Sequence, residues 1–269
     1  METKIEIPRP KNPEDICDQF KALVEVIRIL RKKCPWDSKQ TNESIAHLFV
    51  EETYETINAI YEHNDEEFSK ELGDIMLHVI MHAVMAEERG AFNLIDVMTK
   101  IRKKLIHRHP HVFDNLEVNG EEEVVQNWEA LKMQEGQRSI LDGVPNSLPS
   151  LLRAQRIQHK VSRVGFDWEN SDGAWEKVFE ELNELRREIE NKNKEKAVEE
   201  LGDLLFAIVN TARFEDIVAE EALHLTNNKF TKRFKYIEKK AREIGKKLSE
   251  MTLEEMDKLW DEAKQIEKR

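Results

Sequence analysis

The stretch VEELGDLLFAIV, residues 198–209, places two acidic residues inside an apolar helical pattern. The apolar residues that recur at helical spacing are expected to be buried, and they are Leu201, Leu204, Leu205, Ile208 and Val209. Glu200 and Asp203 lie three residues apart and therefore share one face of a helix. The same ELGD sequence occurs at 71–74, and in both places an EExxE sequence precedes it. A constant offset of 129 residues relates the acids of the two copies, which are Glu52, Glu55, Glu71 and Asp74 in the first and Glu181, Glu184, Glu200 and Asp203 in the second. The pattern indicates a duplicated unit with four carboxylates in each copy.

The spacing of the acids predicts that the four carboxylates of each copy converge. In the second copy the polar sequence NKNK, residues 191–194, marks a turn between two helices. Two pairs of acids are equidistant from Lys192, eight and eleven residues away: Glu184 with Glu200, and Glu181 with Asp203. The first copy has the same arrangement about His63. Residues equidistant from the turn of an antiparallel hairpin lie level with each other, so two acidic pairs face one another in each copy.

Four carboxylates this close cannot all ionise without compensation, so either some are protonated or they hold cations. Oxygen-only ligands favour Mg²⁺, with Mn²⁺ as a substitute, over Zn²⁺. We therefore expect a metal site in the second copy and a second metal site in the first. Gly202 lies between two of the acids, where glycine costs about 1 kcal/mol relative to alanine. We expect it to let a facing helix or a ligand approach the backbone.

Other residues suggest what such a metal would serve. Lys229 and Arg233 lie at i, i+4 and point the same way on a helix. Trp260 offers an aromatic surface on which a nucleobase can stack. Together with a carboxylate cage, these residues suggest a metal-bridged phosphate compound with an aromatic end, which is a nucleotide. A GxxxxGK[ST] phosphate loop does not occur in the sequence.

The elements that position these residues are expected to be helical. The chain has 269 residues, of which 39% are hydrophobic and 36% charged, with only 9 Gly and 7 Pro. The net charge of −12 disfavours a nucleic-acid partner. Two cysteines suggest no disulfide framework and fit a reducing, cytoplasmic location. No apolar run approaches the ~18 residues of a membrane span, so no membrane partner is expected.

The repeat predicts an all-α protein with two helical-bundle domains joined by a linker. The segment RSILDGVPNSLPSLL contains prolines and a glycine and is the natural connection. We expect an N-terminal domain over residues 1–137, a linker over 138–152 and a C-terminal domain over 153–269.

Several short sequences along the chain resemble one family. They are CPWD, EETYE, ELGD, HRHPHVF, LLRAQRIQ, VGFDW, EELNE, EELGDLLF and NKFTKRF, in that order and in both halves. The chain resembles MazG, a family of nucleoside triphosphate pyrophosphohydrolases in the all-α NTP-pyrophosphatase superfamily. The likeness runs from about residue 15 to the end and is to the two-domain type.

The resemblance implies that nucleoside triphosphates, including dNTPs, react with water to give NMP and pyrophosphate with Mg²⁺. It implies a four-helix core in each domain and a homodimer whose partner helps complete each site. Carried over by motif, the metal ligands are Glu181, Glu184, Glu200 and Asp203, and with Glu180 they form the catalytic set. The implied nucleotide-binding residues are Lys177, Glu180, Glu181, Lys196, Glu199, Asp203, Lys229, Arg233 and Trp260. In the family the N-terminal half can be inactive, yet here it keeps all four acids.

Two other classes of protein compete with this interpretation. A redox di-iron bundle also uses carboxylates on helices, but it normally needs Glu-x-x-His motifs. Here the residue three after Glu71 is Asp74, and the residue three after Glu200 is Asp203. A non-enzymatic regulatory or scaffold dimer would show nucleotide turnover at background with any metal.

Overall fold

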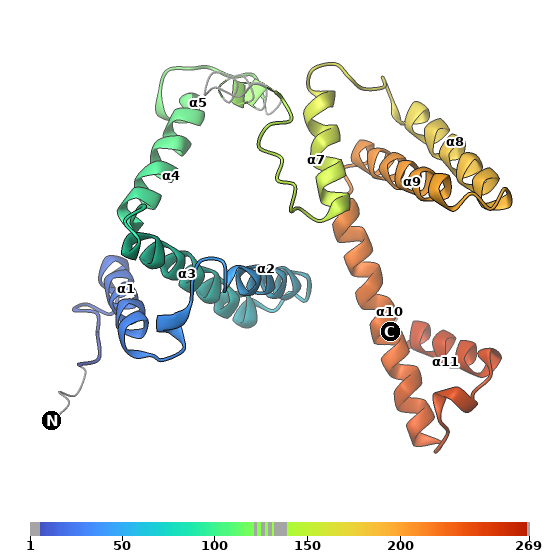
Figure 1. Cartoon of the computed structure of the whole chain (residues 1–269), viewed down its shortest axis with the longest axis horizontal. Coiled ribbons are helices and arrows are strands. Elements are labelled where there is room, and N and C mark those ends of the chain that lie inside the picture. Colours follow the sequence, from blue (N-terminus) through green and yellow to red (C-terminus); the bar gives the residue numbers. More distant parts are fainter. Residues whose placement is uncertain (1–5, 121–122, 125–126, 129–130, 132–138, 268–269) are drawn as a thin grey trace. The chain divides into compact units, whose positions relative to one another are not determined.

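The computed structural model describes residues 6–120, 123, 124, 127, 128, 131 and 139–267 (Figure 1). Within these residues the secondary structure is helical and contains no strand, which confirms the all-α prediction. The chain divides into two compact units, Met1–Val124 and Val125–Arg269. The predicted boundary between residues 137 and 138 lies outside the described residues.

The first unit is built around a helical hairpin. Its elements are α1 (Ile16–Lys33), η1 (Asp37–Lys39), α2 (Ala46–Tyr61), α3 (Asp65–Glu88), α4 (Leu94–Arg108) and α5 (Pro110–Phe113). Helices α2 and α3 pair closely, and α1 and α4 both pack on α3. The buried core of this unit gathers apolar side chains from α1, the residue before α2, α3 and the start of α4, namely Ile27, Ile45, Ile80, Met81, Ala83, Val84, Met85 and Leu94.

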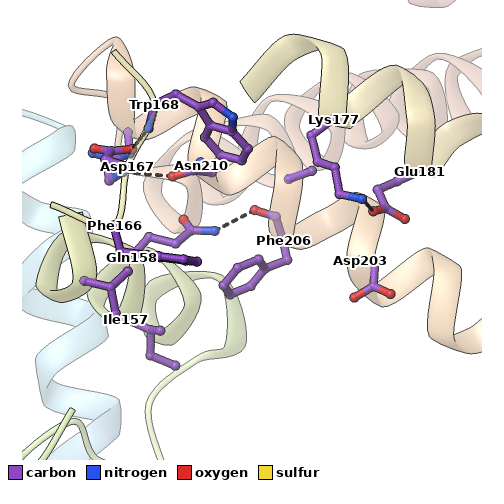
Figure 2. Close-up of a pocket in the computed structure, with 13 residues that line it drawn as sticks. Ile157, Gln158, Phe166, Asp167, Trp168, Lys177, Glu181, Asp203, Phe206 and Asn210 are labelled. Carbon is purple, nitrogen blue, oxygen red and sulfur yellow. Dashed lines mark hydrogen bonds and ion pairs between the residues drawn. The ribbon is translucent and has the colours of Figure 1, made fainter. Parts of the chain in front are cut away.

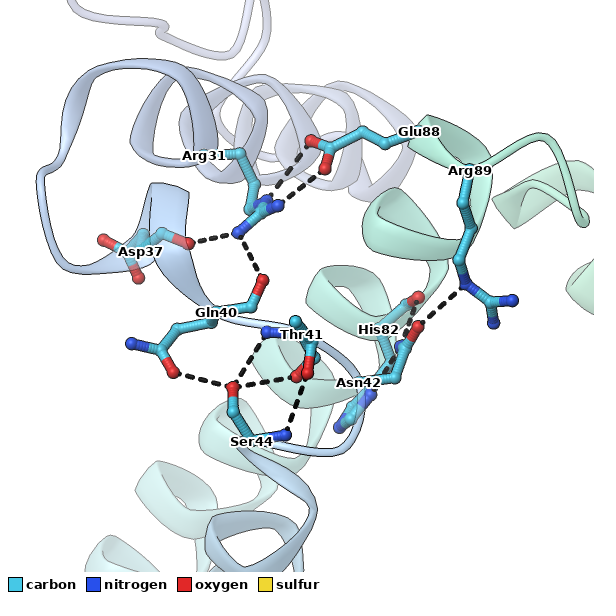
Figure 3. A network of polar contacts seen from close by, with 9 residues as sticks. All are labelled: Arg31, Asp37, Gln40, Thr41, Asn42, Ser44, His82, Glu88 and Arg89. Atoms are coloured by element: carbon cyan, nitrogen blue, oxygen red, sulfur yellow. Dashed lines mark hydrogen bonds and ion pairs between the residues drawn. The ribbon is translucent and has the colours of Figure 1, made fainter.

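An arginine network fastens the segment between α1 and α2 to the rest of the first unit (Figure 3). The Arg31 guanidinium on α1 donates to Glu88 on α3 at 2.6 Å, and to the carbonyl oxygens of Asp37 and Gln40. Asn42 continues the network, because its amide donates to the carbonyl oxygen of His82 at 3.1 Å. These contacts set where the chain enters α2, which carries the first EExxE sequence.

The second unit contains the matching hairpin. Its elements are α7 (Ser150–Ser162), α8 (Ser171–Glu190), α9 (Lys194–Phe214), α10 (Ala219–Glu243), η2 (Leu248–Glu250) and α11 (Leu253–Ile266). Helices α8 and α9 form the hairpin, α7 packs on α9, and α11 folds back on α10. Helix α7 begins inside the segment predicted as linker. The linker carbonyls of Ile140 and Asp142 accept from the buried Lys160 ammonium on α7, at 2.7 and 3.2 Å.

Both hairpins turn at the residues that the acid spacing singled out. His63 and Lys192 adopt positive φ angles, 52° and 57°. Asparagine follows each of them, and the side chains of Asn64 and Asn193 accept from backbone amides in the first turns of α3 and α9. Such caps satisfy otherwise unpaired N–H groups and fix the start of each helix. The predicted hairpin geometry is confirmed in both copies.

The expectations for α9 are met only in part. Leu204 and Val209 are buried as predicted, but Leu201, Leu205 and Ile208 are nearly half exposed. The helix packs on α8 and α7 along part of its apolar surface only. No facing helix approaches Gly202, since a Cβ built there would meet no atom of a described residue within 4 Å. The space beside it is therefore open to a ligand or to another chain.

Two further features complete the fold. Cys17 and Cys34 are free thiols, as expected. Within the described part of the chain, no helix combines the length and the apolar character that crossing a bilayer requires.

Candidate active site

The α8–α9 hairpin brings the predicted acids of the second copy together. Glu181, Glu200 and Asp203 each offer a carboxylate oxygen, and these oxygens lie within 4.8 Å of one another. Glu180, Glu181 and Glu184 form a second such group. Glu181 belongs to both groups and is only 4% exposed. The two groups therefore form one continuous acidic site centred on Glu181.

Lys177 balances part of this negative charge. Its ammonium lies 2.5 Å from a Glu181 carboxylate oxygen and 2.9 Å from one of Glu180. Hydrogen bonds to these two carboxylates raise the pKa of Lys177 above its ordinary value, Glu181 contributing most. Lys177 thus stays charged beside the buried Glu181.

The remaining acids are less well compensated. Loss of hydration raises the pKa of Glu200, and the negative charges of Glu184, Glu181 and Asp203 raise it further. A divalent cation would remove this repulsion, and the donor set consists of carboxylate oxygens alone. Such a set fits a hard cation such as Mg²⁺ or Mn²⁺.

The first copy assembles a similar group on α2 and α3. Carboxylate oxygens of Glu52, Glu55 and Glu71 lie within 4.8 Å of one another, whereas Asp74 is not a member of this group. Glu71 is 1% exposed; its Oε1 accepts from Lys70 at 3.0 Å, and its buried Oε2 has no partner among the described residues. Loss of hydration, followed by the charges of Asp74 and Glu55, raises the pKa of Glu52. This arrangement also fits a cation.

The two copies place their balancing lysine on opposite helices of the hairpin. In the first copy Lys70 lies on α3, and the matching position of the second copy is Glu199. In the second copy Lys177 lies on α8, and the matching position of the first copy is Leu48. The acids are therefore duplicated, but their compensation is not.

A cavity of about 320 Å³ adjoins the acidic site of the second copy (Figure 2). Its residues come from α7, the loop before α8, α8 itself and α9, and they include Gln158, Phe166, Trp168, Lys177, Glu181, Asp203, Phe206 and Asn210. Most of the lining is apolar, with Lys177, Glu181 and Asp203 on one side in Figure 2 and Trp168 and Gln158 on the other. Apolar walls with a few polar groups are typical of small-molecule sites.

An ion pair and a glycine position Trp168 at this cavity. Arg213 on α9 donates to Asp167 at 2.5 Å and so holds the loop before α8. The indole ring lies directly over Gly173 in the first turn of α8. The sequences VGFDW and LLRAQRIQ, which contain Trp168 and Gln158, were identified only as motifs, and Asn210 and Arg213 were missed altogether. The aromatic residues Phe166 and Trp168 on either side of Asp167 were the available signal that this loop lines a site.

The other predicted nucleotide-binding residues do not line this cavity. Lys196 and Glu199 are exposed on α9. Lys229 and Arg233 lie on α10 and Trp260 lies on α11, where the Arg233 guanidinium sits 5.4 Å from the Trp260 ring and 2.7 Å from Glu267. Among the described residues, no hydrogen bond, ion pair or ring contact joins Arg233 or Trp260 to the carboxylates of α8 and α9.

Comparison with known proteins agrees with this architecture of two carboxylate-bearing helical hairpins. The family model for the MazG nucleotide pyrophosphohydrolase domain matches residues 40–113 and 171–237, one segment in each unit. The chain belongs to the MazG family.

Three similar proteins illustrate the family. A Thermotoga maritima protein named nucleoside triphosphate pyrophosphohydrolase/pyrophosphatase MazG is 43% identical, over 91% of this chain and 95% of its own length. An Escherichia coli K12 protein named nucleoside triphosphate pyrophosphohydrolase is 39% identical, over 93% of this chain and 97% of its own. The Bacillus subtilis protein YabN, named as uncharacterized, is 44% identical over 99% of this chain, which spans 56% of that protein's length.

Proposed function

We propose that this protein is a nucleoside triphosphate pyrophosphohydrolase that converts NTPs and dNTPs to NMP and pyrophosphate in the presence of Mg²⁺. The observation that carries this proposal is the meeting of two carboxylate groups at Glu181, beside an aromatic-lined cavity. The names of the Thermotoga and Escherichia relatives support the same activity.

In this proposal the carboxylates of the second copy bind the cation and orient the triphosphate. The ligands are Glu181, Glu184, Glu200 and Asp203. When bound, Mg²⁺ supplies neutralisation of phosphate charge and a lowered pKa for a water molecule. The Glu180 carboxylate, exposed at the edge of the site, accepts the proton of the attacking water. Water adds to the α-phosphorus, the bond from that phosphorus to the bridging oxygen breaks, and pyrophosphate leaves.

A homodimer is part of the proposal because a single chain leaves Arg233 and Trp260 without contact to the acids. It also leaves part of the apolar surface of α9 exposed. Lys229 and Arg233 are assigned to stabilise charge on the leaving pyrophosphate, and Trp260 is assigned to the nucleotide. A second copy would bring these residues to the acids and cover the half-exposed Leu201, Leu205 and Ile208 of α9. Burial of such apolar surface favours association.

The first copy is proposed as a second metal site. Glu52, Glu55 and Glu71 form its close group, with Asp74 as the fourth acid. The buried, unpartnered Oε2 of Glu71 supports cation binding there.

The experiment measures NMP and pyrophosphate release from a panel of NTPs and dNTPs, with Mg²⁺, with Mn²⁺ and with chelator. Wild type is compared with Glu52→Gln, Glu181→Gln and the double variant, each checked for helical content and thermal unfolding. We expect Glu181→Gln to lower kcat/KM by at least about 100-fold, since even residues that only support metal ligands contribute about 10–100-fold. Reaction in ¹⁸O-labelled water should place the label in NMP.

The outcomes separate the parts of the proposal. Label in pyrophosphate would overturn attack at the α-phosphorus. Full activity with chelator would overturn the metal requirement. A well-folded wild type that releases no product from any substrate would overturn the enzyme assignment. Partial loss of activity in Glu52→Gln would place a working site in the first copy. Full activity in Glu52→Gln would mean that the first copy does not contribute to turnover.

A further inference from the structure

Gln158 on α7 presents an unpaired oxygen at the cavity beside the acidic site. Its side chain is 4% exposed, and its Nε2 donates to the carbonyl oxygen of Phe206 on α9 at 2.8 Å. Its Oε1 is buried and has no hydrogen-bond partner among the described residues. Gln158 lines the cavity (Figure 2). Buried polar atoms are nearly always hydrogen-bonded, so an exception calls for a reason.

The neighbouring Gln155 shows that α7 can satisfy a buried glutamine completely. Gln155 Nε2 donates to the carbonyl oxygen of Ile217 at 2.8 Å, and its Oε1 accepts from the Ala219 amide at 3.0 Å. Gln155 does not line the cavity, whereas Gln158 does. The unpaired atom therefore occurs at the one of these two glutamines that faces the cavity.

The surroundings of Gln158 suit a nucleobase. The cavity walls next to it include Ile157, Val161, Phe166, Phe206 and Ala207, which match the apolar faces of a flat ring. A volume of about 320 Å³ is at the lower end of the range for small-molecule sites. It fits the nucleoside part of a nucleotide, while Glu181 and Asp203 line the side where metal-bound phosphates would lie.

We propose that Gln158 Oε1 accepts a hydrogen bond from the exocyclic amino group of the substrate base. This proposal rests on the proposed function and makes Gln158 a specificity-determining residue. The amide cannot turn to offer a donor instead, because that would set its oxygen against the Phe206 carbonyl oxygen. Adenine and cytosine carry an amino group, whereas hypoxanthine and uracil carry a carbonyl oxygen at the same ring position. The site therefore favours the amino-bearing member of each pair.

The test compares matched substrates in wild type and in Gln158→Met, an apolar side chain of similar size. We expect wild type to prefer ATP over ITP and CTP over UTP by about tenfold in kcat/KM, as for one neutral hydrogen bond. In Gln158→Met both ratios should fall to near one, through loss on ATP and CTP. Gln155→Met is the matched control, and it should lower the melting temperature while leaving both ratios unchanged.

A measurement of binding affinity tests the proposal independently of catalysis. The affinities of wild type for α,β-methylene-ATP and its inosine counterpart, measured with Mg²⁺ by calorimetry, should differ by the same factor even if no turnover is seen. Equal affinities, with wild-type ratios near one, would overturn the proposal without any variant. An equal loss of kcat/KM on all four substrates in Gln158→Met would also overturn the proposal. A sugar contact or a general packing defect would then explain the effect of the substitution.

Discussion

Trp168 and Gly173 are in direct contact: a Cβ built on Gly173 would lie 2.3 Å from the Trp168 Cδ1 atom. Side-chain carbons do not approach so closely, so the indole can occupy its place at the cavity only because residue 173 is glycine. A backbone position in the first turn of α8 thereby controls an aromatic wall of the candidate site.

Gly173→Ala is therefore expected to displace the Trp168 ring. We expect a destabilisation of about 1–3 kcal/mol, as for other overpacked sites, together with a shifted tryptophan emission and a lower kcat/KM. Gly73→Ala is the control, because a Cβ there meets no atom within 4 Å. An unchanged emission spectrum and unchanged kinetics in Gly173→Ala would contradict the contact.

The Asp167–Arg213 ion pair is expected to stabilise the loop that carries Trp168. Arg213 is 9% exposed and Asp167 is 22% exposed, so solvent screens the pair incompletely. Arg213→Met should lower the free energy of unfolding in urea by about 1–3 kcal/mol, because it leaves a partly buried carboxylate unpaired. Arg186→Met removes the exposed pair with Glu190 and should change it by less than about 1 kcal/mol. Equal effects of the two variants would count against the loop anchor.

Lys177 is expected to stabilise the metal-free site more than the metal-bound one. Lys177→Met removes the cation beside the buried Glu181, so thermal unfolding without divalent metal should begin at a lower temperature. Added Mg²⁺ should then raise the melting temperature by more than it does in wild type, because it replaces the missing charge. Lys264→Met removes an exposed pair with Asp261 and serves as the control. The prediction fails if Mg²⁺ stabilises Lys177→Met and wild type equally.

His159 on α7 is expected to make stability depend on pH. Burial lowers its pKa below the ordinary value of 6.5, and the charges of Arg213, Arg163 and Arg156 lower it further. The folded state therefore keeps the imidazole neutral at pH values where the unfolded chain binds a proton. This contribution is complete above the ordinary pKa and is lost as pH falls from about 6.5 toward the folded pKa.

His159→Gln should consequently flatten the slope of unfolding free energy against pH between about pH 7 and 5. Urea titrations at several pH values measure that slope. His47→Gln changes an exposed histidine on α2 and provides the control. A steeper slope in His159→Gln than in wild type would reverse the assigned sign.

The sequence predicted what depends on local geometry. The equal distances of the acids from His63 and Lys192 were sufficient to place two helical hairpins, because helix period and turn position fix which side chains lie level. The cavity was not predictable in this way. Trp168, Arg213 and Gln158 come from a loop, α9 and α7, and only tertiary packing brings them together.

The same distinction explains the placement of Lys229, Arg233 and Trp260. Lys229 and Arg233 lie four residues apart on α10, as their spacing predicts, and Arg233 lies against Trp260 of α11. Spacing along one helix carries no information about which other helices that face meets. The exposure of Leu201 and Leu205 was not predicted for the same reason. An apolar pattern indicates which residues tend to be buried, but not which helix or chain covers them.

The lysines that balance the two acidic groups have a consequence for the history of the chain. If one ancestral hairpin was duplicated, the acids were retained while the compensating charge moved from one arm of the hairpin to the other. Moving the balancing lysine of the first copy to the position that it has in the second thus needs two changes together, Leu48→Lys and Lys70→Glu. Leu48→Lys alone places two lysines at these positions, and Lys70→Glu alone leaves none. Each single change therefore gives the first copy a charge balance that neither hairpin of the present chain has.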